Sequence, residues 1–413
     1  MLHTLFPKVQ SRFLSLPVLG LIADGFDDWL ATNGYRPDSR KYSIRMLPHV
    51  DAYLRRRRVK EVADLTRPLL HDCWRSLIRI NPTHAGAVRT LERYLDAKGR
   101  VAEGRPVATS PASILVDDYA NYLREVCGFA SATVWNHRYA ARCFLEYLDE
   151  EGITLREIQA TQIESYVTKA GKRMSRASLQ NYISGLRGFL RFLATDGRVP
   201  DGMASQIDTP RLYRLEQLPR ALPWGTVRAL LRSVDRTSAK GLRDYAIFLL
   251  IATYGLRVSE VVAITLDDIR WRQGSLQIQQ GKTSSLLELP LTNEVSFAIA
   301  KHLKKTPPPP PHRRIFLRMR APIGALKRHA VSGAFHSLVR KSGLSISFRG
   351  PHCLRHSLAT QLLKNGTSLK AIGDILGHCS ATSTSTYLRL ATSDLREVPL
   401  PVPGGLLAKE GQQ

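Results

Sequence analysis

The sequence has few cysteines, and they form none of the patterns that cysteine chemistry needs. Only 5 of the 413 residues are cysteine, an odd number without a Cys-x-x-Cys pair. Disulfide-held secreted domains and the common zinc modules both need cysteines paired at short spacing. An apolar segment near the N-terminus is interrupted by Pro17, and no small-residue cleavage site follows it. We therefore expect a protein of a reducing cytoplasm.

A long apolar run is also absent. The longest one extends from Ala246 to Ala252, whereas a transmembrane helix needs roughly 20 such residues. Acidic residues are scarce as well, with 35 Asp and Glu against 60 Lys and Arg, a formal charge of +25 and a pI near 10.2. Such an excess is usually held by a polyanionic partner. Nucleic acid is the first candidate, and the lack of a spanning segment argues against a membrane.

What the chain does have is enough apolar sequence for several cores. Hydrophobic residues make up 43% of the 413, which predicts a folded protein of two or three domains. Two stretches of about ninety residues resemble each other, with glycine-aromatic turns at Gly34 and Gly128. Ser39 and Thr133 stand where helix N-caps are expected, and each is followed fourteen residues later by Tyr-Leu. Two unrelated helical bundles could match by chance, but the matching turns and ends favour duplication.

The third part of the chain has a different pattern. Alternating residues on both sides of Gly281 predict a two-stranded hairpin among helices. The prolines of 307–311 are either a stiff spacer or a ligand for an SH3-type module, and the spacer is simpler. The fold expected is mainly α with a small β-sheet. The predicted divisions are helical domains over 1–105 and 111–200, a third domain over 218–395, and a flexible tail over 396–413.

Short segments of this third domain carry residues suited to chemistry. Arg257 follows the glycine that ends an apolar helix, with Glu260 three residues later, and Lys282 lies at the hairpin tip. Each has a plain structural interpretation, as a surface ion pair or a solvated loop lysine. Taken singly, these residues indicate no function.

Two further segments add histidines, another arginine and a tyrosine. In "GPHCLRHSLAT", His352 and Arg355 share a helical face because residues three apart are neighbours. Basic residues at a helix N-terminus oppose the helix dipole, which makes sense if an external anion binds there. Tyr387 stands nine residues after His378 in a Ser/Thr-rich stretch. An interfacial tyrosine would have the same appearance.

Together these segments resemble the tyrosine recombinases, also called the phage integrase family. The resemblance covers roughly 111–390 and rests on "ATYGLRVSEV", "GPHCLRHSLAT" and "DILGHCSATSTSTY". It implies tandem helical (SAM-like) DNA-binding domains followed by a tyrosine recombinase catalytic domain. The family's catalytic set maps onto Arg257, Lys282, His352, Arg355, His378 and Tyr387.

Phosphoryl chemistry explains why these residue types are needed. A phosphodiester under attack gathers negative charge on its non-bridging oxygens, and two guanidiniums such as Arg257 and Arg355 can clamp those oxygens. The resemblance implies that Tyr387 attacks the phosphate, leaving a 3′-phosphotyrosyl link and a free 5′-hydroxyl. It further implies that Lys282 protonates the leaving oxygen.

The resemblance also implies roles for the remaining residues. His352 is expected to assist proton transfer at the tyrosine, and His378 to donate a hydrogen bond to the phosphate. Glu260 is expected to support Arg257 rather than to touch DNA. Zinc is the rival interpretation of His352-Cys353 and His378-Cys379, but neighbouring helical residues point about 100° apart and chelate poorly. We expect no cofactor and no metal, since the arginines supply the charge that a metal would bring.

The function expected is site-specific recombination of DNA in integration, excision or transposition of a mobile element. The partner is double-stranded DNA with paired recombination sites. The resemblance implies a homo-tetramer, or an assembly with related recombinases, in which the segment after Tyr387 packs on a neighbour. A non-cleaving accessory DNA-binding protein is the alternative, and a type IB topoisomerase a weaker one. The unit over 1–105 departs from the common two-domain plan and favours a mobile-element integrase over a chromosome-dimer resolvase.

Overall fold

A computed structural model shows a mainly helical chain with one small sheet. It describes residues 2–80, 82–101, 110–211, 220–280, 285–347 and 350–377, together with 384, 385 and 387. The described residues divide into two compact units, one drawn from 1–15, 20–47 and 217–413 and the other from 16–19 and 48–216. Each unit is taken by itself below. No helix in the described part of the chain is both long and apolar enough to cross a bilayer.

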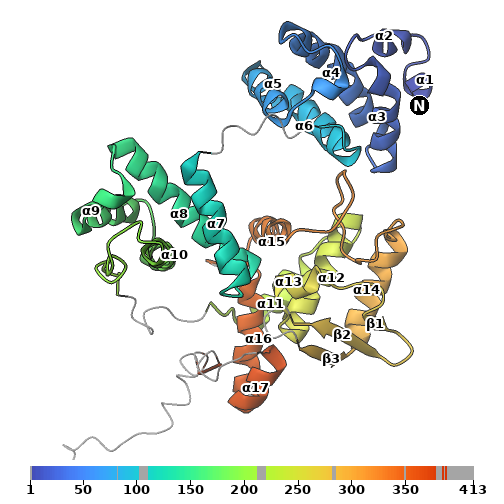
Figure 1. Cartoon of the computed structure of the whole chain (residues 1–413). Helices are drawn as coiled ribbons and strands as arrows, with labels where there is room; N and C mark the ends of the chain where they lie inside the picture. Colours follow the sequence, from blue (N-terminus) through green and yellow to red (C-terminus); the bar gives the residue numbers. More distant parts are fainter. Residues whose placement is uncertain are drawn as a thin grey trace, which may run out of the picture. The chain divides into compact units, whose positions relative to one another are not determined.

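The first half of the chain is helical throughout its described residues (Figure 1). Its first elements are α1 (Leu2–Leu5), α2 (Ser11–Leu14), α3 (Gly20–Thr32), α4 (Pro37–Arg56), the 3₁₀ turn η1 (Val62–Asp64), α5 (Arg67–Ile80) and α6 (Pro82–Ala97). They are followed by α7 (Pro111–Glu125), α8 (Ser131–Glu151), the 3₁₀ turn η2 (Leu155–Glu157), α9 (Ala160–Gly171) and α10 (Arg176–Thr195).

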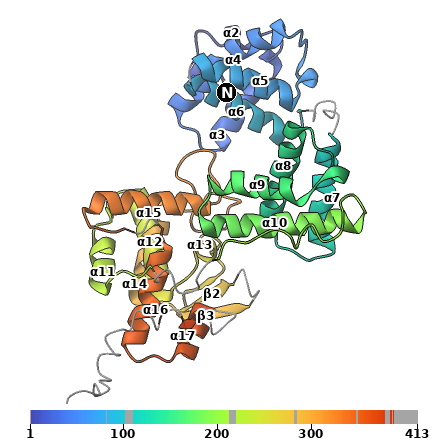
Figure 2. The ribbon, with the colours of Figure 1, turned by 90° about the vertical axis from the view of Figure 1, so that its left-hand side faces the viewer.

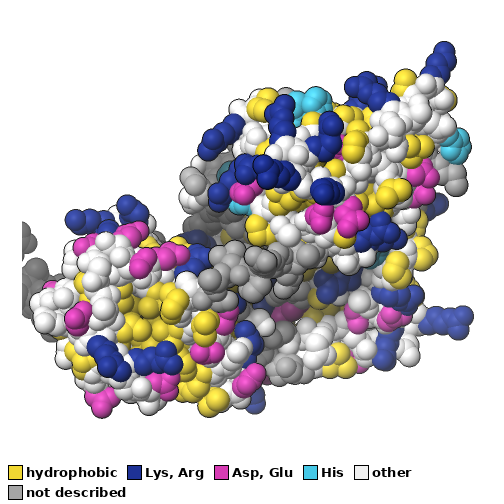
Figure 3. Space-filling model, turned by 45° about the horizontal axis from the view of Figure 1, so that its top comes forward, with side chains coloured by type: hydrophobic (Ala, Val, Ile, Leu, Met, Phe, Trp, Pro, Cys, Tyr) yellow, Lys and Arg dark blue, Asp and Glu magenta, His cyan; other side chains and the backbone are white. Residues whose placement is uncertain are grey.

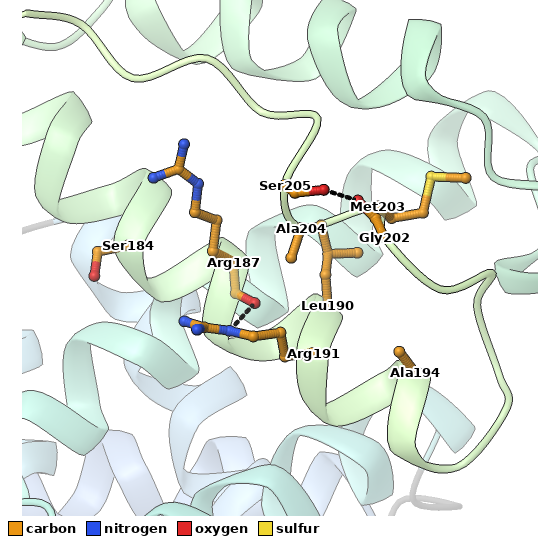
Figure 4. Close-up of a pocket in the computed structure, with 9 residues that line it drawn as sticks. All are labelled: Ser184, Arg187, Leu190, Arg191, Ala194, Gly202, Met203, Ala204 and Ser205. Carbon is orange, nitrogen blue, oxygen red and sulfur yellow. Dashed lines mark hydrogen bonds between the residues drawn. The ribbon is translucent and has the colours of Figure 1, made fainter.

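The helices α7 to α10 enclose an apolar core. α8 packs against both α7 and α10 (Figure 2), and Tyr119, Phe144 and Phe189 are fully buried between them. Burial of such aromatic side chains stabilises a domain by about 1.5–3 kcal/mol each. A cavity of about 460 Å³ lies between α10 and residues 202–205, where Arg191 Nε donates to the carbonyl of Arg187 (Figure 4). Among the residues that the structure describes, no predicted catalytic residue lines this cavity.

The remaining elements surround one buried helix. They are α11 (Trp224–Arg232), α12 (Ala239–Tyr254), α13 (Val258–Val261), β1 (Ile269–Arg270), β2 (Ser275–Gln279), β3 (Leu286–Pro290), α14 (Asn293–Lys305), α15 (Arg328–Ser342), α16 (His352–Lys364) and α17 (Leu369–Leu376). α12 is apolar on nearly all sides and contacts both α14 and α16. Its Phe248 meets Phe335 of α15 edge to face, with ring centroids 5.6 Å apart.

The predicted hairpin is confirmed, within a sheet of three antiparallel strands in the order β1-β2-β3. Leu276 pairs with Leu289 and Ile278 with Leu287, so the apolar side chains of β2 and β3 share one face. The hairpin tip, including Lys282, lies outside the described residues. The third strand of the sheet, β1, has two residues, too few to form the alternating pattern that would predict it.

Both predicted N-caps are wrong. α4 begins at Pro37, two residues before Ser39, because the fixed φ of proline suits the first helical position. α8 begins at Ser131 after the extended backbone of Ala130, so Thr133 lies inside the first turn.

Lys and Arg side chains are spread over the face seen in Figure 3, with Asp and Glu between them.

Candidate active site

The first predicted site residue is positioned by the sharp end of α12. Gly255 has φ +65°, a left-handed conformation that favours glycine, and a Cβ there would lie 2.4 Å from the side chain of Leu376. Glycine is therefore required both by the backbone and by the close approach of α17. Two residues later, Arg257 is the N-cap of α13.

The Arg257 side chain is held in place by hydrogen bonds on two sides. Its Nη1 donates to Glu260 Oε1 at 2.7 Å, and its backbone N–H donates to Oε2 of the same carboxylate at 2.7 Å. Its Nη2 donates to the carbonyl of Gly377 at 2.8 Å. Glu260 is buried, so the ion pair is shielded from water. In this geometry the Glu260 carboxylate holds the guanidinium of Arg257 in place.

Arg355 comes from α16, in which Leu354, Leu358 and Ala359 are buried. The guanidinium is itself buried. Its Nη1 donates to the carbonyl of Gly255, and its Nη2 donates to the carbonyl of Leu376 at 2.5 Å. The last carbonyls of a helix have no intrahelical partner. The end of α17 therefore supplies acceptors to both arginines, through Leu376 and the residue after it.

Two guanidiniums held this close repel each other. Burial, followed by the charge of Arg257, lowers the pKa of Arg355 to about 10. That value still leaves Arg355 charged at neutral pH. The repulsion is relieved when an anion binds, and a phosphate offers oxygens that guanidiniums bind in pairs.

Tyr387 lies in an apolar cluster with Ala359, Ile372 and Leu376, and only 2% of it is exposed. Burial raises the pKa of its hydroxyl, an effect that the charge of Arg355 partly offsets. The phenol is therefore protonated at neutral pH. In this state the tyrosine needs a base before it can act as a nucleophile.

The histidine beside this hydroxyl is His356. Its Nδ1 lies 3.0 Å from the Tyr387 oxygen, and the two ring centroids are 5.7 Å apart. His352, for which the sequence suggested a role at the tyrosine, is exposed at the start of α16. Partial desolvation, then the charges of Arg355 and Arg257, lower the pKa of His352. Its electrostatic neighbours are therefore the arginines of the anion site.

Lys282 and His378 lie outside the described residues, but the residues that flank them are close together. His378 follows Gly377, whose φ is +59° and whose missing Cβ would lie 2.3 Å from the amide of Gln280. Gln280 and Ser285 bracket the tip that carries Lys282, and their backbones are hydrogen-bonded at 2.9 Å. The described residues Gln280 and Gly377 are therefore in close contact.

The sequence did not identify His356 as a partner of Tyr387. It stands in the motif next to Arg355, but a contact between residues 31 apart depends on the path of the chain after α17. The structure also offers no grouping of three His, Cys, Asp or Glu side chains suited to a metal within the residues that it describes. The arrangement can bind an oxyanion and present a hydroxyl beside it.

Comparisons with known proteins identify the relatives of this chain. Residues 222–394 match the phage integrase family, and residues 116–197 match its N-terminal SAM-like domain. An integrase/recombinase of Sinorhizobium fredii named y4rA is 31% identical, over 92% of this chain and 93% of that protein. The tyrosine recombinase XerD of Listeria monocytogenes is 29% identical, over 69% of this chain and 96% of XerD.

A solved structure has the same fold. The Tn1549 transposon integrase, in complex with circular intermediate DNA, matches with a TM-score of 0.52 at 17% identity. The match covers 68% of this chain and 98% of that one.

Proposed function

The chain belongs to the phage integrase family of tyrosine recombinases, and from this membership we propose that it cleaves and rejoins DNA through a 3′-phosphotyrosyl intermediate. Its task is the integration, excision or transposition of a mobile element. The observation that carries the proposal is the pair of guanidiniums held by the end of α17, with the hydroxyl of Tyr387 under the charge of Arg355.

In this proposal the two arginines bind the scissile phosphate. Arg257 and Arg355 are already hydrogen-bonded in position, so binding costs little reorganisation, and their charge stabilises the oxyanion that develops. His352 lies on the same side of α16 as Arg355 and serves the phosphate with them. Lys282 protonates the leaving 5′-oxygen, and His378 donates a hydrogen bond to the phosphate. No metal ion is needed for charge.

The proposed domains divide this work. Residues 111–200 and 218–395 bind DNA from two domains, 1–105 form a further helical domain, and 396–413 are a tail. The Sinorhizobium protein matches along 92% of this chain, which includes most of 1–105. XerD matches along 69%. The additional unit over 1–105 favours a mobile-element recombinase over a chromosome-dimer resolvase. Family membership further supports an assembly, a tetramer or one with related recombinases, on two DNA sites.

The test is covalent capture of DNA. A nicked suicide substrate, built from inverted repeats sought by sequencing the DNA on both sides of the gene, should form a protein–DNA adduct with the wild-type chain in buffer containing EDTA. Tyr387→Phe should bind the same DNA and form no adduct, because the ring remains and the nucleophile is gone. An adduct that persists in the variant would move the nucleophile elsewhere. DNA binding without any adduct, even by the wild type, would favour a non-cleaving accessory protein.

A further inference from the structure

His356 occupies a position that the proposed mechanism has not yet used. It lies on α16 one turn after His352, and its Nδ1 is 3.0 Å from the hydroxyl oxygen of Tyr387. The Tyr387 ring is held by apolar residues of α16 and α17. The phenol oxygen is therefore fixed on one side by packing and on the other by a ring nitrogen.

The surroundings of His356 determine whether the proton lies on its imidazole or on the hydroxyl of Tyr387. Burial, followed by the positive fields of His352, Arg355 and Arg220, lowers the pKa of His356 to about 4. The imidazole is therefore neutral at physiological pH, while the Tyr387 phenol keeps its proton. With the ring proton on Nε2, the phenol O–H donates and Nδ1 accepts.

We propose that His356 is the proton acceptor for the nucleophile, so that Nδ1 orients the Tyr387 hydroxyl and receives its proton during cleavage. The inference rests on the proposed function, since it assigns the base for that reaction. It differs from the expectation drawn from the sequence, which gave proton transfer at the tyrosine to His352. In the structure His352 is exposed and lies under the fields of the two arginines.

The step balances as a general-base substitution. The bond from Tyr387 Oη to phosphorus forms while the bond from phosphorus to O5′ breaks. The Oη proton moves to Nδ1 of His356, and O5′ takes a proton from an acid, for which Lys282 is proposed. In rejoining, the 5′-hydroxyl attacks phosphorus and gives its proton to Lys282, while the bond from phosphorus to Tyr387 Oη breaks and His356 returns its proton to Oη.

The low pKa of His356 applies to the site when no DNA phosphate is bound. After burial, positive neighbours lower the pKa of His356 further, and a bound phosphodiester places negative charge among them. An opposite charge within about 4–6 Å favours the protonated imidazole. DNA binding therefore makes His356 a stronger base at the moment when a base is required.

The experiment measures single-turnover adduct formation on the nicked substrate from pH 6 to 9. His356→Ala should slow adduct formation by about 10²–10⁴-fold at pH 7, with DNA affinity unchanged. Its rate should rise about tenfold per pH unit, because hydroxide replaces the lost acceptor, and added imidazole should restore part of it. His356→Asn keeps an acceptor oxygen near the Nδ1 position but cannot take the proton. It should therefore remain slow unless imidazole is added.

Controls separate this inference from the function on which it rests. His336→Ala removes an exposed histidine of α15 and should react at the wild-type rate. An adduct formed by Tyr387→Phe would defeat the proposed function itself. If Tyr387→Phe is inert and His356→Ala reacts normally, only the role of His356 is wrong.

Two other outcomes would also overturn the assignment. Faster cleavage by His356→Ala would mean that the hydrogen bond holds Tyr387 in an inactive position and does not activate it. A slow variant with the wild-type pH profile and no imidazole rescue would mean that His356 acts by position alone. Should His356→Ala melt early, His356→Asn, which is nearer in shape, decides by the same pH profile.

Discussion

The helices over residues 20–97 and those over 111–195 have the same order of elements. In each stretch a first helix, α3 or α7, is followed by a long helix, a 3₁₀ turn and two more helices. The turns agree in detail. Gly99 and Gly197 both have φ +62°, and the next residue in each case donates its N–H back to a leucine carbonyl, at 2.9 and 3.0 Å.

The two stretches differ in what they bury. Asp51 of α4 is buried and accepts the backbone N–H groups of Val18 and Leu19 at 3.0 and 2.9 Å. The corresponding position of α8, counted from the shared Tyr-Leu pair, is the buried Leu145. In the first stretch, a carboxylate fixes the segment that precedes α3. The second stretch has only apolar packing at that position.

The surfaces differ as well. Four exposed arginines, Arg55–Arg58, span the C-terminal end of α4, where the second stretch has the acidic residues 149–151. On α8 the rings of Trp135 and Tyr139 stack at 5.8 Å, with the Arg142 guanidinium over Tyr139. The helix ends of the two stretches agree, whereas their surfaces differ. This suggests that the same arrangement of helices occurs twice and that each copy contacts a different partner surface.

The largest effect is expected from the exposed arginines. Replacing Arg55–Arg58 by Gln should weaken binding to the recombination site on the order of 1,000-fold if all four contact phosphates. The slope of log affinity against log salt should then fall by about 3.6, at about 0.9 for each contact. Titrations at several salt concentrations measure both.

A variant with four Lys in these positions is the matched control, because it keeps the charge. If the salt slope is unchanged in the Gln variant while assembly on paired sites fails, the first stretch contacts another protomer instead of DNA. The two helical stretches would then differ in partner as well as in surface.

A smaller effect is expected at Asp51. Asp51→Leu introduces the residue type of the second stretch and leaves the N–H groups of Val18 and Leu19 without their acceptor. The local stability should fall by about 2–3 kcal/mol. Hydrogen exchange at those two amides should accelerate by about 30-fold or more. Asp51→Asn keeps an acceptor oxygen and should exchange more slowly than the Leu variant; equal rates would show that the carboxylate does not hold this segment.

The smallest effect concerns how the two long helices end. Arg58 has φ +62°, rare for a residue with a side chain, and Gly152 has φ +68° at the same place after α8. Arg58→Gly should therefore stabilise the first stretch by about 0.5–1 kcal/mol, and Gly152→Arg should destabilise the second by about 1 kcal/mol. Thermal unfolding of both variants measures the change. Shifts of the same sign would contradict the parallel between the two ends.

Features set by local chemistry were predictable from the sequence. Alternation on both sides of Gly281 predicted the strands β2 and β3. Helix starts were predicted less well, because Ser39 was read as a cap although Pro37 already begins the helix. Those errors concern single backbone positions.

The geometry of the site was harder to predict. Types and order of residues indicated Arg257 and Arg355, but the acceptors that hold them are backbone carbonyls. Every residue has a backbone carbonyl, so no sequence motif identifies the ones that accept these hydrogen bonds. The contact of His356 with Tyr387 likewise depends on the fold between them.

The enclosure of Tyr387 has a consequence for the fate of broken DNA. The side chain is 2% exposed, in a cluster with Ala359, Ile372 and Leu376. In the proposed reaction the strand end becomes an ester of this residue, and hydrolysis of that ester would leave a permanent break. Apolar walls admit few water molecules. The same packing that buries the side chain therefore favours resealing by a 5′-hydroxyl over loss to water, and so protects the genome while its strands are open.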